Sequence, residues 1–340
     1  MNIFHRTLSP LALLVIAGSA SASEADLAKR IAQQDGWIAY QVPMIADAGV
    51  PCCFEWHDKR AHRGECDLEG RNWNIGTNDG ERAQAVSDTL DVYLRVAHGR
   101  IEKVRAFAAT CPVRDADKVH WLDGVEARPS IVLLGGVAAA TTSQDIADNA
   151  IAAVALHADV AATPALGELA GSSHPRKVRE QALFWLGQLR GADGAHIVEH
   201  VATTDGDAEL RAEAVFALSQ AHAVDAYAAI HRIAQSDPSE HVRGQALFWM
   251  AQTGDARAKD DITVAIGKET SKDVREQAVF ALSQLKDHEA DAALIALVRG
   301  NYPREVKKQA LFWLGQSGSN EAMKFLDGVL SRGAEKAIDG

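Results

Sequence analysis

Two short segments of the sequence carry residue types that could bind a metal ion. The first holds three cysteines and two histidines within 15 residues, namely Cys52, Cys53, His57, His62 and Cys66. Thiolate and imidazole groups at this density are typical zinc ligands. However, the segment lacks the paired C-x2-C elements of a zinc finger, and in an oxidising compartment the same cysteines form disulfides. We therefore expect disulfide bonds here, and no metal or other cofactor.

The second segment is HIVEH at 196–200, which fits the H-x-x-E-H zinc motif of inverted metalloproteases. In that motif two histidines bind the metal and the glutamate activates a water molecule. The aliphatic residues of this segment already account for the buried face of a helix, and no neighbouring repeat offers an evident third ligand. We interpret the match as coincidental and expect no catalytic residues. The alternative function is a metal-dependent or lyase-type enzyme that uses His196, Glu199 and His200 or the Cys/His cluster.

All four cysteines of the chain, Cys52, Cys53, Cys66 and Cys111, lie in its first third. Adjacent residues of an extended segment point to opposite faces, which disfavours a bond between Cys52 and Cys53. Each of these two is then expected to take either Cys66 or Cys111. Of the two pairings left, we favour Cys53 with Cys66 and Cys52 with Cys111.

Residues 1–22 have the pattern of a secretory signal peptide. Arg6 precedes an apolar run over 11–18, and ASA at 20–22 places small residues around a cleavage site. We expect a mature chain that starts at Ser23 and is periplasmic or secreted. No later stretch reaches the roughly 18 to 20 apolar residues that cross a bilayer, so we expect no membrane insertion. The net charge of -11 gives no basic surface for nucleic acid.

Residues 23–128 are predicted to form a small β-rich domain that contains the cysteines. Its clearest strand is Leu90–Val96, in which apolar and polar residues alternate. A turn over 97–100 follows, where Gly99 is free to adopt a positive φ, and the chain returns as a second strand. We expect this hairpin to lie in a small antiparallel sheet. The predicted elements are a helix over 23–34 and strands over 37–42, 71–75, 90–96 and 101–108.

Beyond residue 128 one segment recurs every 32 residues. VREQALFWLGQL at 178–189 returns, with small changes, at 210–221, 242–253, 274–285 and 306–317, and IADNAIAAVALH at 146–157 occupies the same frame. A fixed period between about 20 and 50 residues indicates a solenoid, in which each unit buries its apolar face against its neighbours. A less regular helix precedes each copy, so we expect each repeat to be a helical hairpin.

The motif resembles the HEAT-like repeat family, in particular the short subtype also present in phycocyanobilin lyases. The family pattern V-R-x-x-A-x-x-A-L-G is matched, for example, by Val274, Arg275, Ala278, Ala281 and Leu282. The resemblance covers roughly residues 130–335 and says little about function, because such arrays serve as scaffolds, regulators and occasionally lyases. It implies a mainly α protein in which residues 129–340 form a HEAT-like α-solenoid of about six helical hairpins.

The array departs from that pattern at one position. Trp185, Trp249 and Trp313 replace the second small residue, whereas the alternate units keep Ala217 and Ala281, so the true repeat is a pair of units. At about 100° per residue, the Val of the motif, the Ala four residues later and the Leu eight residues later share one face, with the Trp at its edge. We expect this face to be the core, where each Trp fills space that an Ala leaves in an adjoining unit.

Polar residues also recur at defined places in the array. Ser130 and Ser143 are positioned to cap its first two helices. A basic residue follows the first residue of the motif in five units, and we expect it to cap or to pair with acidic residues of an adjoining unit, such as Asp205 or Asp237. These basic residues are Arg179, Arg211, Arg243, Arg275 and Lys307.

A second set of residues, which we call the Phe/Gln stripe, lies outside the core face. It comprises Phe184, Gln188, Phe216, Gln220, Phe248, Gln252, Phe280, Gln284, Phe312 and Gln316. One interpretation is a ladder of Phe packing and amide hydrogen bonds between repeats. The other is that the stripe lies on the concave side of the superhelix and forms a groove for a segment of a partner. We expect a non-enzymatic scaffold that binds an unidentified protein or peptide through this face.

Overall fold

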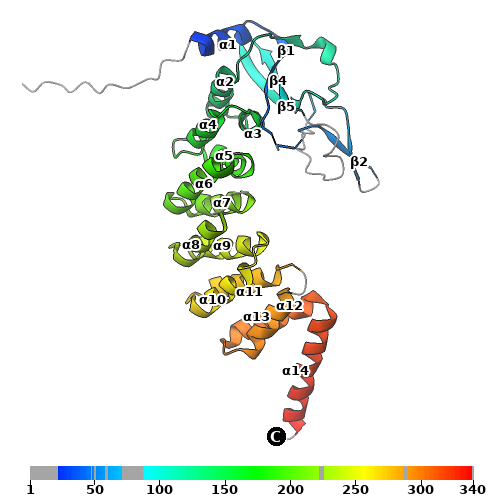
Figure 1. Ribbon diagram of the computed structural model, residues 1–340, viewed down its shortest axis with the longest axis vertical. Coiled ribbons are helices and arrows are strands. Elements are labelled where there is room, and N and C mark those ends of the chain that lie inside the picture. Colours follow the sequence, from blue (N-terminus) through cyan, green and yellow to red (C-terminus); the bar gives the residue numbers. More distant parts are fainter. Residues whose placement is uncertain are drawn as a thin grey trace, which may run out of the picture.

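The computed structural model describes residues 22–46, 48–49, 51–57, 60–70, 87–221, 226–286 and 289–338. A small sheet domain lies at one end of a long column of paired helices (Figure 1). Residues 1–21 of the predicted signal peptide and the predicted strand over 71–75 lie outside the described residues.

The sheet domain begins with a helix and continues with a four-stranded sheet of order β5-β4-β1-β6. β4 and β5 form the predicted hairpin, and both His98 and Gly99 at its turn have positive φ, which suits a tight connection between twisted strands. β6 runs parallel to β1, so the expectation of a purely antiparallel sheet was wrong. After β5 the chain crosses to the free edge of β1 instead of turning back by a hairpin. The elements are α1 (Ala22–Ala32), β1 (Gly36–Pro43), β2 (Phe54–His57), β3 (Arg60–Arg63), β4 (Thr89–Ala97), β5 (Arg100–Ala108) and β6 (His120–Trp121).

Over its described residues, the array consists of six helical hairpins and a final helix, which confirms the predicted solenoid. In Figure 1 the first helices α6, α8 and α10 lie to the left of the second helices α7, α9 and α11. The second helices coincide with the six copies of the recurring motif. The hairpins are α2 (Ala127–Ala140) with α3 (Gln144–Leu156), α4 (Ala162–Leu169) with α5 (Arg176–Leu189), α6 (Gly191–Thr204) with α7 (Ala208–Gln220), α8 (Ala226–Ser236) with α9 (Glu240–Gln252), α10 (Ala258–Lys268) with α11 (Lys272–Ser283), and α12 (Glu289–Arg299) with α13 (Arg304–Ser317); α14 spans Asn320–Ile338.

The predicted core face is buried along the whole array. In α9, for example, Val242, Ala246 and Met250 are all fully buried. Small residues let neighbouring second helices approach closely: a Cβ on Gly187 would lie 2.2 Å from the carbonyl oxygen of Ala217 in the next repeat. The glycine is therefore required by the distance between the backbones of α5 and α7.

The sheet domain and the first hairpin share one core. We expected Ser130 to cap α2, and this was wrong. The helix begins at Ala127, and Ser130 is fully buried in its second turn. Its hydroxyl lies 2.8 Å from Tyr40 Oη and 2.9 Å from His157 Nε2. His157 Nδ1 lies 2.7 Å from the carbonyl oxygen of Ala153. A carbonyl only accepts, so Nδ1 carries the proton and Nε2 accepts from Ser130.

The predicted position of Ser143 is correct. It is the residue before α3, although its side chain makes no capping hydrogen bond. The helix that it precedes contacts the sheet, since the backbone N–H of Ile45, just after β1, donates to Leu156 and that of Ala158 donates to Pro43. The predicted boundary near residue 128 between the sheet domain and the array is thus a change of secondary structure, and the hydrophobic core continues across it.

Candidate functional site

The regular spacing of the basic residues along the array places three of them in ion pairs between successive repeats. Arg179, Arg211 and Arg243 each reach a carboxylate 26 positions later, in the loop before the next second helix. Their partners are Asp205, Asp237 and Glu269 respectively. This confirms the expected pairing with acidic residues of the adjoining unit for these three of the five basic residues. We call these three contacts the inter-repeat clamps.

Each clamp also organises the loop that holds it. The carboxylate accepts the backbone N–H two residues further on, at Asp207, Ser239 or Ser271. Burial would raise the pKa of Asp205, but hydrogen bonds from the Asp207 backbone N–H and the Arg179 side chain outweigh it and lower that pKa. The same balance lowers the pKa of Glu269. These ionised, bonded carboxylates stabilise the stack of repeats.

The clamp series stops before the last hairpin. The residue 26 positions after Arg275 is Asn301, an amide in place of a carboxylate. Within the described residues, no acidic side chain pairs with Arg275 or with Lys307. The junction between the fifth and sixth hairpins therefore lacks the ion pair that joins the second hairpin to the third, the third to the fourth and the fourth to the fifth.

The rings of the Phe/Gln stripe pack against one another and against the tryptophans. Phe184 stacks on Phe216, with centroids 6.2 Å apart, and Phe216 lies 4.7 Å from Trp249 in the next repeat. The same order returns one pair of units later. Phe248 stacks on Phe280 at 5.8 Å, and Phe280 lies 5.0 Å from Trp313. Within single helices, Phe248 contacts Trp249 and Phe312 contacts Trp313, which makes the series of rings continuous.

The rings remain partly open to solvent despite this packing. Phe184, Phe216, Phe248 and Phe280 are half-buried, and Phe312 is 54% exposed. Trp249 and Trp313 are also half-buried, whereas Trp185 is buried. The amides follow a gradient: Gln188 and Gln220 are half-buried, and Gln252, Gln284 and Gln316 are exposed.

The amides do not form the expected hydrogen bonds between repeats where their bonds are defined. Gln220 Nε2 donates to Ser219 and Gln284 Nε2 donates to Ser283, each within its own helix. The ladder interpretation thus holds for the rings and fails for these amides. The outcome is a row of partly exposed rings and amides on the second helices.

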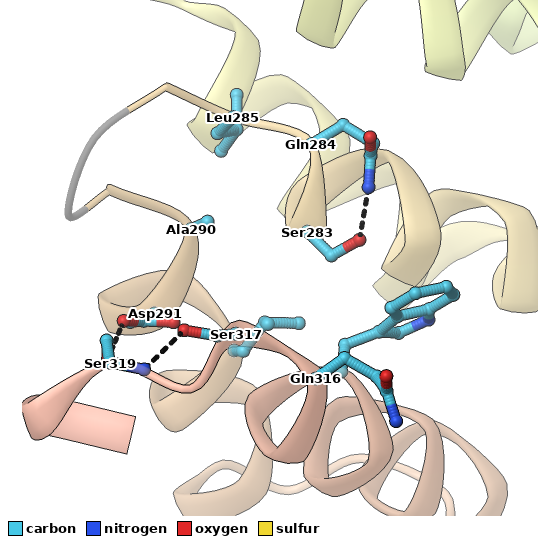
Figure 2. Close-up of a pocket in the computed structure, with 10 residues that line it drawn as sticks. Ser283, Gln284, Leu285, Ala290, Asp291, Gln316, Ser317 and Ser319 are labelled. Atoms are coloured by element: carbon cyan, nitrogen blue, oxygen red, sulfur yellow. Dashed lines mark hydrogen bonds between the residues drawn. The ribbon is translucent and has the colours of Figure 1, made fainter. Parts of the chain in front are cut away.

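A cleft of about 430 Å³ lies between the fifth and sixth hairpins, at the C-terminal ends of α11 and α13. Figure 2 shows Ser283 and Gln284 on one side of it and Asp291, Ser317 and Ser319 on the other. Trp313 and Gln316 also line it, so the cleft adjoins the Phe/Gln stripe. Our sequence reasoning missed Asp291, whose signal was an acidic residue amid the apolar face of α12. A second cleft, of about 440 Å³, lies beside the clamp of Arg243 and Glu269.

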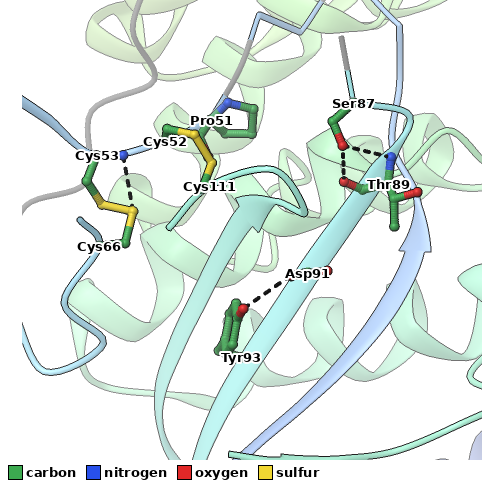
Figure 3. The surroundings of a disulfide bond; sticks show 9 residues. All are labelled: Pro51, Cys52, Cys53, Cys66, Ser87, Thr89, Asp91, Tyr93 and Cys111. Atoms are coloured by element: carbon green, nitrogen blue, oxygen red, sulfur yellow. Dashed lines mark hydrogen bonds between the residues drawn. A yellow bond between two sulfur atoms is a disulfide. The ribbon is translucent and has the colours of Figure 1, made fainter. Parts of the chain in front are cut away.

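The cysteines of the Cys/His cluster are bonded to one another (Figure 3). Cys52 pairs with Cys111, with Cα atoms 5.5 Å apart, and Cys53 pairs with Cys66, with Cα atoms 5.2 Å apart. The favoured connectivity is therefore confirmed. Sulfurs in disulfides are not thiolate ligands, so this arrangement does not fit a zinc site.

The H-x-x-E-H segment lies on α6 with its histidines, His196 and His200, exposed. Glu199 forms an ion pair with Arg232 of α8. This ion pair occupies the carboxylate that would have to act as the base if the segment were a metalloprotease site. Across the described ranges, no group of three or more His, Cys, Asp and Glu side chains is placed to hold a metal ion. None of the helices in this part of the chain is long and apolar enough to cross a membrane.

The family model for HEAT repeats matches residues 227–315. No curated protein matches the chain. Similar solved structures include YibA from Escherichia coli, with 22% identity and a TM-score of 0.33 over 46% of this chain and 60% of that one. Human deoxyhypusine hydroxylase with glycerol has 15% identity and a TM-score of 0.30, over 55% and 84%. The complex of CpcE and CpcF of phycocyanin lyase from Nostoc has 18% identity and a TM-score of 0.31, over 58% and 80%.

Proposed function

We propose that this array of HEAT-like repeats is a non-enzymatic scaffold that binds a segment of another protein along the Phe/Gln stripe. The observation that carries the proposal is the partial exposure of the rings over five successive second helices. Monomeric proteins rarely leave contiguous apolar rows in contact with water, and such rows commonly mark interaction sites. The exposed amides of Gln252, Gln284 and Gln316 supply the polar rim expected of an interface.

We place this binding outside the cytoplasm, in the periplasm or the extracellular medium. Two observations support export: the signal-peptide pattern over 1–22 and the two disulfides of the sheet domain. Disulfides persist in oxidising compartments and are rare in the cytosol. The stripe lies on the second helices, and we propose that this row faces the concave side of the superhelix.

Site-directed photocrosslinking tests the proposal in the native host. A photoreactive residue at Gln252, exposed on the stripe, should give discrete crosslinked products with a partner. The same residue at Val264, which is exposed on the first helix α10, is the matched control. Products from Val264 alone, or equal products from both positions, would contradict binding along the stripe.

A further inference from the structure

Asp291 is a buried carboxylate without a described cation. It is 5% exposed, and its Oδ2 accepts a hydrogen bond from the hydroxyl of Ser319. That hydroxyl in turn accepts the backbone N–H of Ala322, 3.0 Å away, at the start of α14. In the described part of the chain, Oδ1 of Asp291 receives no hydrogen bond and no Lys, Arg or His side chain pairs with it. A buried charge held in this way is costly unless a countercharge reaches it.

Elsewhere the array pairs its recessed loop carboxylates with arginine. Asp205, Asp237 and Glu269 each bind a guanidinium supplied by the preceding repeat. Asp291 differs because it lies on α12 and lines the cleft, which opens at the C-terminal ends of α11 and α13 and not at the N-terminal ends where the clamps lie. The side chains that line the cleft offer acceptors for several N–H groups, including the Gln284 and Gln316 amides and the Ser317 hydroxyl.

Trp313 supplies an aromatic surface in the same cleft. A guanidinium is planar, stacks on aromatic rings and donates five hydrogen bonds, whereas an ammonium is a compact point charge. The volume of about 430 Å³ falls within the usual range for small-ligand sites. The net charge of -11 also favours a basic partner.

We infer that the cleft is an anchor site for an arginine side chain of the bound segment, with its guanidinium on Asp291 and its flat face against Trp313. This inference rests on the proposed binding along the Phe/Gln stripe, because Gln284, Trp313 and Gln316 belong to or adjoin that stripe. According to this inference, the partner segment carries an exposed arginine, and residues next to that arginine contact the rings of the Phe/Gln stripe.

Titration of the mature chain with N-acetyl-arginine methylamide tests the anchor site without any partner. The readout is the indole N–H signal of Trp313 in NMR spectra, assigned with Trp313→Phe. Saturable shifts are expected with the arginine probe and not with the norleucine analogue, which has a similar aliphatic chain and no cation. Asp291→Asn should weaken binding about tenfold or more, because a charge-assisted hydrogen bond is lost.

Asp261→Asn is the matched control, since Asp261 on α10 also accepts a hydrogen bond from a hydroxyl, that of Tyr227. It should leave the affinity unchanged. If Asp291→Asn does not fold, Gln284→Glu provides the second variant and should tighten binding by adding a carboxylate to the cleft. Equal binding of the two probes, or no saturable binding, overturns the inference. If the Gln252 crosslink nevertheless forms, the proposed function stands and only the arginine anchor is lost.

Discussion

Arg211 and Asp237 form a two-point ion pair between α7, the second helix of the third hairpin, and the loop of the next repeat. Arg211 Nε lies 2.8 Å from Asp237 Oδ2, and Nη2 lies 2.8 Å from Oδ1. Both residues are buried. The same arginine donates from Nη1 to the carbonyl oxygen of Asp205, so one side chain joins two successive loops. These directed hydrogen bonds attract successive repeats to one another and also set the distance between them.

Replacing Arg211 by Ala should destabilise the array by about 3 to 5 kcal/mol, because Asp237 is left buried and unpaired. Arg275→Ala is the control: the equivalent loop position holds Asn301, so the loss should be about 1 kcal/mol or less. Urea unfolding of the two variants gives the comparison. Similar losses for both would show that the ion pairs contribute little to the stack.

Stability should fall as the pH drops from about 6.5 to about 4, through protonation of His157. Burial lowers the pKa of the His157 imidazole to about 4, below its usual 6.5, so the unfolded chain binds the proton more tightly. Stability therefore rises with pH across this window, by about 3 kcal/mol in total. In His157→Gln this part of the pH dependence should vanish. If the stability of His157→Gln depends on pH in the same way as that of the unaltered chain, the acid sensitivity comes from other groups.

Phe248→Ser should lower the free energy of unfolding by about 2 to 3 kcal/mol and also weaken partner binding. The ring stacks on Phe280 and contacts Trp249, yet it is half-buried, so it contributes to packing and to the open row. Phe312→Ser separates the two effects, because Phe312 is 54% exposed. It should cost less than about 1 kcal/mol of stability and still reduce binding. Melting curves and the yield of the Gln252 crosslink provide the two measurements.

Removing the Cys52–Cys111 disulfide should cost more than removing Cys53–Cys66. Cys52 and Cys111 are 59 residues apart, and Cys53 and Cys66 are 13 residues apart. The loss of chain entropy in the unfolded state therefore gives stabilisations of about 4 and about 3 kcal/mol respectively. Paired Cys→Ser variants compared by denaturant unfolding test the order. In the unreduced exported chain, thiol titration in denaturant should detect no free thiols. Two or more reactive thiols there would contradict the oxidised state.

Regular patterns in the sequence were sufficient to predict the array. The 32-residue period predicted the six hairpins, because every second helix must bury the same face against its neighbours. The β4–β5 hairpin followed from alternation and a glycine turn. The opposite directions of adjacent side chains disfavoured a Cys52–Cys53 bond and left two pairings, of which the favoured one is the pairing in the structure. Each of these inferences depends on residues that are close in sequence or equivalent by repetition.

Only the tertiary structure decided the roles of single polar residues. Ser130 is a residue type that often caps helices, but its hydroxyl accepts a hydrogen bond from Tyr40, 90 positions away, and donates one to His157, 27 positions away. In the sequence Asp291 is an acidic residue on the apolar face of α12, but the cleft that it lines forms only where the ends of α11, α12 and α13 meet. The exposure of the Phe/Gln stripe likewise depends on the distance between repeats. Local periodicity specifies which face of a helix is buried, whereas burial and pairing of a given polar atom depend on distant chain segments that periodicity does not encode.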